Sequence, residues 1–215
     1  LEWDLRYPSV EGFEGMVLWN RSLDGPRALP GAYEATLSVG DQQSTVPVSV
    51  RPDPRSTASA EELASQFDFV WSVNRKLTET HQAIRRLRDA RAQIDAVAAR
   101  VEGDDAYAAL VEAGDALKET LGRVETTLYQ TRLESRQDPL NFPIRLNDKL
   151  AGVMGLVAFG DHPPTASALA VRDELVTAID AALTELDQAL GETLDAYNAL
   201  ADETGLPAVL APAET

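Results

Sequence analysis

A run of apolar residues at heptad spacing between residues 63 and 101 limits the fold of this chain more than any other feature. The members of the run are Leu63, Val70, Val73, Leu77, Ile84, Leu87, Ile94, Ala98 and Val101. Because spacings of three, four and seven residues put side chains on one face of a helix, we predict one long helix with coiled-coil character. Ser59 and Glu62 form a capping box at its start, and Gly103 ends it. The helix should have about 43 residues and a length of about 65 Å at 1.5 Å per residue.

Three later segments repeat this spacing and supply helices that can cover the long apolar face. They span residues 104–128, 144–159 and 165–204, and prolines interrupt the chain before the third and the fourth helix. We therefore predict a mainly α fold, an antiparallel four-helix bundle with three long helices and one short helix, over residues 56–205. Residues 206–215 are predicted to be a disordered tail.

Residues 1–55 show a different pattern, in which apolar residues alternate over short runs. The runs cover residues 1–7, 15–19, 33–39 and 45–50, and each predicts a β-strand. Gly40 and Asp41 between the last two runs predict a hairpin turn. An immunoglobulin-like sandwich has about seven strands, and fewer make a poor independent sheet. We therefore expect residues 1–55 to form a partial immunoglobulin-like β module whose other strands lie upstream in a longer parent chain.

The charge of the chain restricts its partners. With 19 basic and 35 acidic residues, the net charge is −16 at pH 7. Since this charge repels phosphate backbones and anionic lipids, we expect no nucleic-acid partner and no membrane partner. Residues 165–204 contain nine acidic residues and one basic residue, Arg172. We expect this acidic helix to pack, through exposed ion pairs, beside a cluster in the first helix that comprises Arg85, Arg86, Arg88 and Arg91.

The residues that usually carry out catalysis are scarce. The chain has no cysteine, which removes thiolate metal sites and cysteine nucleophiles. His81 and His162 are its two histidines, and neither has carboxylates at metal-ligand spacing, so we interpret both as surface or loop residues. Acidic pairs are numerous, but a chain this acidic has them by chance. We predict no catalytic residue, no metal site and no cofactor.

Aromatic residues gather on both sides of the linker at residues 52–55. We predict that these two groups meet and fix the β module against the helices, provided that Trp71 is less than half exposed. The alternative function for them is a platform on which a sugar stacks. The candidate module interface consists of Trp3, Trp19, Phe67, Phe69 and Trp71.

A second candidate site is the polar loop between residues 138 and 148, which surrounds two prolines. Its side chains could bind a ligand or could satisfy backbone groups at helix ends, and we favour the capping role. The residues concerned are Asp138, Asn141, Arg145, Asn147 and Asp148.

Several short motifs follow one another along the chain. They are Trp3-Asp4-Leu5-Arg6-Tyr7-Pro8, Gly15-Met16-Val17-Leu18-Trp19, Arg51-x-Asp53-Pro54-Arg55 and Gln137-Asp138-Pro139-Leu140-Asn141-Phe142-Pro143. In order and spacing, these motifs resemble the C-terminal region of large bacterial Asp-box β-propeller proteins, which are often labelled sortilin-type or glycosyl-hydrolase-like repeat proteins. The resemblance implies an upstream β-propeller and an extracytoplasmic location, either periplasmic or secreted. Any hydrolase activity it implies belongs to the propeller, and no catalytic residue of that family maps onto this chain.

These observations lead to one expected function and two alternatives. We expect a non-catalytic accessory or interaction region that supports or docks the propeller or a protein partner. One alternative is a carbohydrate-binding part of a glycoside-hydrolase-like enzyme, which rows of exposed aromatic side chains would favour. The other is a free-standing coiled-coil adaptor, which a bare apolar groove along the helices would favour.

Overall fold

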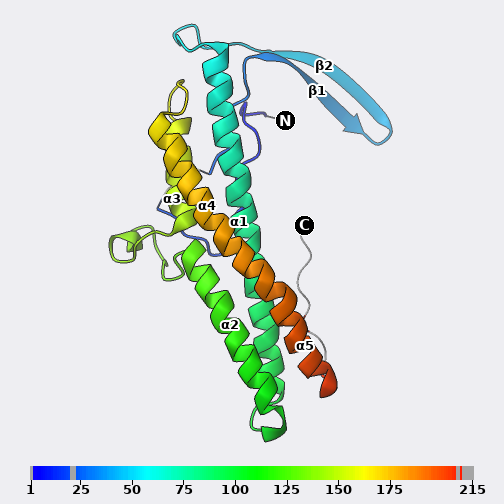
Figure 1. Cartoon of the computed structure of the whole chain (residues 1–215). Coiled ribbons are helices and arrows are strands. Elements are labelled where there is room, and N and C mark those ends of the chain that lie inside the picture. Colours follow the sequence, from blue (N-terminus) through cyan, green and yellow to red (C-terminus); the bar gives the residue numbers. More distant parts are fainter. Residues whose placement is uncertain (1, 20–22, 207–208, 210–215) are drawn as a thin grey trace.

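The computed structural model describes residues 2–19, 23–206 and 209, and it is mainly helical, as predicted (Figure 1). Two strands, β1 (Gly31–Val39) and β2 (Gln42–Val50), precede all the helices. The helices are α1 (Ala60–Arg100), α2 (Ala108–Leu128), α3 (Leu146–Ala158), α4 (Ala166–Gln188) and α5 (Leu194–Glu203). Three single turns, η1 (Asp105–Tyr107), η2 (Asp138–Leu140) and the π-helical η3 (Ala189–Thr193), connect them. Within the described residues, no helix combines the length and apolar character that crossing a bilayer requires.

Helix α1 confirms the prediction from the heptad run. The Ser59 side chain accepts a hydrogen bond from the Glu62 amide at 3.2 Å, and the Glu62 carboxylate accepts one from the Ser59 amide at 2.8 Å. This is the predicted capping box, which satisfies two amides that have no partner inside the helix. The helix contains 41 residues and extends along the whole helical part of the molecule (Figure 1). Most members of the heptad run are buried, among them Val70, Val73, Leu77, Ile84, Leu87 and Ile94.

Helices α2 and α3 lie beside different halves of α1. Arg88 of α1 pairs with Glu125 of α2, and Asp95 pairs with Lys118, so the two helices are antiparallel. The opposite end of α1 meets α3, where the Gln66 side chain donates to the Val157 carbonyl. Since α2 and α3 follow one another along α1, they form a single row rather than two (Figure 1).

Helices α4 and α5 form the third row. Lys76 of α1 pairs with Asp180, and Arg86 pairs with Asp187, so α1 and α4 run in the same direction. The π-helical turn η3 joins α4 to α5 without a break in the rod, and the sequence pattern did not predict this turn. The four predicted helices are therefore present as α1, α2, α3 and the α4–α5 rod (Figure 1). The predicted antiparallel four-helix bundle is not confirmed, because these helices form three rows and α1 and α4 run in the same direction.

The arginine cluster meets three different elements rather than the acidic helix alone. Arg86 pairs with α4 as expected. Arg85, however, pairs with Glu11 near the start of the chain, and Arg88 and Arg91 pair with Glu125 of α2. The cluster spans two turns of α1, and its members therefore point to different sides of the helix.

The first 55 residues form two of the four predicted strands. β1 and β2 pair as an antiparallel hairpin with Gly40 in the turn at φ +58°, as the Gly40 and Asp41 signal predicted. The strand predictions for residues 1–7 and 15–19 are wrong over the described part of those ranges, which is irregular except for one bridge between Arg6 and Arg27. Where a partial immunoglobulin-like module was predicted, the described residues form a two-stranded antiparallel sheet.

Residues 2–19, which we call the arm, lie along the helices instead of in a sheet. Polar side chains of α1 bind the arm backbone: the Asn74 amide donates to the Pro8 carbonyl at 3.1 Å, and the Arg85 guanidinium donates to the Gly12 carbonyl at 2.8 Å. The Trp19 amide donates to a carboxylate oxygen of Asp148 in α3 at 2.6 Å. These bonds replace the strand ladder, which explains why an apolar alternation here does not produce strands.

The predicted disordered tail is only partly described. Residues 207, 208 and 210–215 lie outside the described residues. Val209 is buried, and its amide and carbonyl bond to the Asn198 side chain at 2.7 and 2.9 Å. At this residue the chain is packed against α5, and disorder in the rest of the tail stays a prediction.

Candidate functional site

The hairpin presents an apolar face whose outer part, away from the helices, is exposed. In an antiparallel pair, side chains alternate between the two faces, and the register pairs Ala35 with Val46 and Leu37 with Ser44. Leu37, Val39 and Val46 are 57%, 68% and 54% exposed. Together with their neighbours, the residues on this apolar face are Tyr33, Ala35, Leu37, Val39, Val46, Val48 and Val50. Figure 1 shows the hairpin extending away from the helical rows.

The base of the hairpin is held in place by the arm. The Tyr33 hydroxyl donates to the Leu29 carbonyl at 2.8 Å, and the Trp3 ring packs edge-on against Tyr33 with ring centroids 5.6 Å apart. Backbone bonds at 2.8 and 3.0 Å join the arm to residues 26–28, immediately before β1. These contacts fix the direction of the hairpin at its base and leave its apolar face exposed.

A pocket of about 230 Å³ lies where the hairpin base meets the arm, α1 and the end of α3. Its wall combines apolar side chains such as Leu63 and Phe67 of α1 with a charged rim. The charged members of that rim are Arg6, Arg27, Arg51, Asp53 and Asp161. With three cations and two anions, this rim is locally basic in a chain whose net charge is −16.

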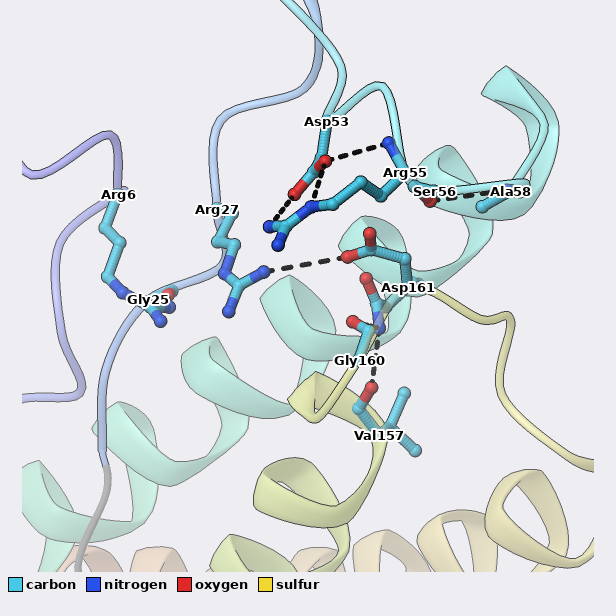
Figure 2. Close-up of polar contacts among 11 residues, drawn as sticks. Arg6, Gly25, Arg27, Asp53, Arg55, Ser56, Ala58, Val157, Gly160 and Asp161 are labelled. Carbon is cyan, nitrogen blue, oxygen red and sulfur yellow. Dashed lines mark hydrogen bonds and ion pairs between the residues drawn. The ribbon is translucent and has the colours of Figure 1, made fainter.

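Most charges around this pocket already have partners within the chain (Figure 2). Arg27 lies 3.6 Å from the Asp161 carboxylate, and Arg6 donates to the Gly25 carbonyl at 2.8 Å. The hydrogen bond from the Arg55 side chain lowers the pKa of Asp53 and keeps this carboxyl group ionised at neutral pH. Of these pairs, Arg27 with Asp161 joins the segment before the hairpin to the end of α3. A carboxylate of lowered pKa, such as Asp53, is unsuited to act as a general acid.

The predicted module interface is formed by part of the predicted set. Tyr7 of the arm packs edge-on against Phe67 and Trp71, with ring centroids 4.9 and 5.5 Å apart. Trp71 is partly buried, so the condition attached to this prediction is met. Trp3 is close to the hairpin base, against Tyr33. The contact between the arm and α1 thus depends on Tyr7, which belongs to the aromatic group before the linker but not to the five residues of the candidate interface.

The other two predicted interface residues lie elsewhere. Phe69 is buried on the opposite side of α1, under the Arg172 guanidinium of α4 at 5.1 Å from the ring centroid. Two residues along a helix correspond to about 200° of rotation, so Phe67 and Phe69 cannot both face the arm. Trp19 is 45% exposed near the middle of the molecule, where its amide bonds to Asp148.

The polar residues between 138 and 148 do not form one site. Asp138 accepts bonds from the Glu134 and Ser135 amides, both at 2.7 Å, which fits the predicted capping role. Asn141 and Arg145 are exposed. Asn147 and Asp148 are not in the loop but in the first turn of α3, where both are buried. Asp148 binds the arm directly, and Asn147 binds His81, which in turn binds the arm.

His81 is buried, which contradicts the prediction that it is a surface or loop residue. Its Nδ1 lies 2.7 Å from the Glu11 carbonyl, which accepts only, so Nδ1 carries the proton and Nε2 accepts from the Asn147 amide at 3.3 Å. Burial lowers the pKa of His81. The spacing of four after Leu77 and three before Ile84 puts His81 on the apolar face, and this signal was present in the sequence.

Glu125 is a second buried polar residue that the sequence pattern did not single out. Its side chain is 5% exposed, and its two carboxylate oxygens accept bonds from Arg88 and Arg91 at 2.7 and 2.6 Å. It lies between Leu121 and Leu128 at helical spacing, on the buried face of α2. The pairing neutralises a buried charge and links α2 to α1.

Among the described residues, no group of three or more histidine, aspartate and glutamate side chains is placed to hold a metal ion. Comparisons of the chain with known protein families, with curated proteins and with solved structures found no match. The hairpin face and the pocket at its base are therefore the features on which a function can be argued.

Proposed function

We propose that this chain is a non-catalytic docking module that presents its hairpin to a β-structured protein partner. One observation supports the proposal above all: three apolar side chains of the hairpin, Leu37, Val39 and Val46, are more than half exposed. They lie on one face and within a few residues of each other. Contiguous exposed apolar side chains are typical of surfaces that another protein covers.

The stability of short sheets supports the same function. An isolated two-stranded hairpin is only marginally stable in water, and three or more strands or a packed face are needed. The base contacts of Trp3 and Tyr33 supply part of this support, and a partner that covers the apolar face supplies the rest. We propose that partner and hairpin together form an immunoglobulin-like sheet next to the helical bundle.

The motif resemblance gives this partner a class. We propose that it is an Asp-box β-propeller of the same parent chain, in an extracytoplasmic protein. The carbohydrate-binding alternative has weaker support, because Tyr7, Phe67 and Trp71 meet edge-on and do not form an open row. The coiled-coil adaptor also has weaker support, because the heptad face of α1 is already buried by the other two helical rows.

Surface plasmon resonance of the whole chain on immobilised Asp-box β-propellers, together with a glycan array, tests this function. Replacing Leu37 and Val46 by threonine removes apolar surface but keeps side chains suited to strands, and we expect binding to weaken about tenfold. The matched control replaces Ser38 and Gln43, a cross-strand pair on the opposite face, by threonine and should change affinity less than about threefold. Saturable glycan binding without affinity for any propeller would overturn the proposal.

A further inference from the structure

The two edges of the hairpin differ in their capacity to accept another strand. The register pairs Pro47 of β2 with Glu34 of β1. Proline has no N–H group, so Pro47 occupies a position whose nitrogen faces away from β1, where no ladder bond is lost. The outer edge of β2 therefore lacks a donor at its centre, which is a common way to block strand addition.

The outer edge of β1 has no such block. Residue pairs in an antiparallel ladder alternate, so Thr36 and Thr45, two residues from the Glu34 and Pro47 pair, also direct their backbone groups outward. Their hydroxyls are 2.9 Å apart, as expected for the closer, non-hydrogen-bonded kind of pair. The backbone groups of β1 that face outward belong to Ala32, Glu34, Thr36 and Ser38, all of them exposed.

The arm already pairs with the segment that leads into β1. The Ala28 amide donates to the Leu5 carbonyl at 2.8 Å, and the Tyr7 amide donates to the Pro26 carbonyl at 3.0 Å. This pairing ends before β1, because the chain bends at Pro30 and β1 begins at Gly31. No backbone bond from the arm to β1 itself is present among the described residues, which leaves the outer edge of β1 open.

We propose that the partner binds by adding a basic, extended strand to the outer edge of β1, an inference that rests on the proposed docking function. Alternate apolar side chains of the added strand would lie beside Leu37 and Val39 on the same face of the sheet. A lysine or arginine would lie opposite Glu34 on the other face. The net charge of −16 attracts a basic segment and repels a second copy of this acidic chain.

The direct test is an NMR titration of the whole isotope-labelled chain with a synthetic peptide of sequence TVKVTVKVT. The expected result is saturable binding, with the largest shifts and the strongest new protection from hydrogen exchange at the outward amides of β1. The control peptide TVEVTVEVT has the same alternation but negative charge, and it should bind at least about tenfold more weakly. If the largest shifts and the new protection appear at amides of the β2 edge instead of the β1 edge, the proposal is wrong.

Two proline variants separate edge pairing from face docking. Thr36→Pro and Thr45→Pro each remove one outward N–H and the same hydroxyl pair, and neither removes a ladder bond of the hairpin. We expect Thr36→Pro to weaken peptide and propeller binding about tenfold and Thr45→Pro to weaken them less than about threefold. Cross-strand NMR contacts between Tyr33 and Val48 verify that both variants retain the hairpin.

Each outcome of these experiments distinguishes the two proposals. If the Leu37 and Val46 variant loses propeller binding but Thr36→Pro does not, docking through the face stands and strand addition is wrong. If neither variant changes propeller binding, the docking function itself is wrong. A wild-type dimer in light scattering that Thr36→Pro abolishes would identify a second copy as the occupant and overturn the basic strand.

Discussion

Lowering the pH from 7.5 to 5.5 should destabilise this protein through one buried imidazole. His81 is buried with its Nδ1 proton bonded to the Glu11 carbonyl and its Nε2 facing the Asn147 amide. The side-chain oxygen of Asn147, Oδ1, accepts a hydrogen bond from the Asp148 backbone amide at 2.8 Å. This bond fixes the side-chain amide so that its NH₂ group faces the His81 ring. A second proton on the ring would therefore face a donor, near the positive charge of Arg85.

The sign and size of the effect follow from proton linkage. Burial lowers the folded-state pKa of His81 below that of the unfolded chain, so the unfolded state binds more protons as the pH falls. The stabilisation from His81 is fully present when the pH is above the pKa of the ring in the unfolded chain, which is about 6.5. It is lost as the pH falls towards the lower pKa of the ring in the folded protein. At pH 5.5, the loss of stability relative to high pH has an upper limit of about 1.4 kcal/mol, which applies if the folded ring takes up no proton.

Urea unfolding at pH 7.5 and 5.5 measures this loss. His81→Asn keeps a donor for the Glu11 carbonyl but does not titrate, so its stability should be nearly equal at the two pH values. The exposed-histidine control, His162→Gln, should keep the wild-type loss. Glu11 and Asp53 have lowered pKa values, and their contributions are lost only at pH values below this range.

Two results would refute this reasoning. One is a wild-type loss that persists unchanged in His81→Asn. The other comes from an NMR titration of the wild-type chain, which does not depend on the variant folding: the pKa of His81 should lie below that of an unperturbed imidazole. A normal pKa for His81 would show that burial does not disfavour the charged ring.

Three further predictions concern close packing and a buried charge. Glu125→Gln should lower the free energy of unfolding by about 2 kcal/mol, because it leaves Arg88 and Arg91 without their carboxylate. The control Glu119→Gln changes an exposed side chain of the same helix and should alter the free energy of unfolding by less than about 0.5 kcal/mol. Gly25→Ala would place a Cβ 2.1 Å from a backbone oxygen of the arm, so we expect a loss of about 2 kcal/mol and faster proteolysis of the arm; unchanged values would contradict that contact. Gly114→Ala meets side chains at 3.0 and 3.1 Å and should destabilise by about 1 kcal/mol in a urea titration, whereas Gly122→Ala, in the same helix with open space, should stabilise by a similar amount.

Local sequence signals predicted the elements that depend on local interactions. The capping box at Ser59 and the heptad run predicted α1, and Gly40 with Asp41 predicted the hairpin turn. Each of these signals acts within a few residues, so it needs no knowledge of the rest of the fold. Element boundaries set by glycine or proline were predicted for the same reason.

The arm and the row shared by α2 and α3 could not be predicted in this way. An alternating segment such as residues 15–19 forms a strand only if another strand supplies its backbone partners, and here Tyr129 and Asp148 supply them. A heptad pattern shows which face of a helix is buried but does not identify the helix that covers it. The candidate module interface was predicted only in part for the same reason, since local sequence does not show that Tyr7, rather than Trp19, contacts Phe67 and Trp71.

The path of the arm has a consequence for the order in which the chain acquires its structure during synthesis. The Trp19 amide binds Asp148, which is made 129 residues later. At about 5 to 20 residues per second, a ribosome needs about 6 to 26 s to produce that stretch. During this interval the apolar side chains of Val10 and Leu18, both buried in the finished protein, lack part of their final environment. The arm is therefore synthesised before every helix and yet completes its native contacts only after α3 has formed.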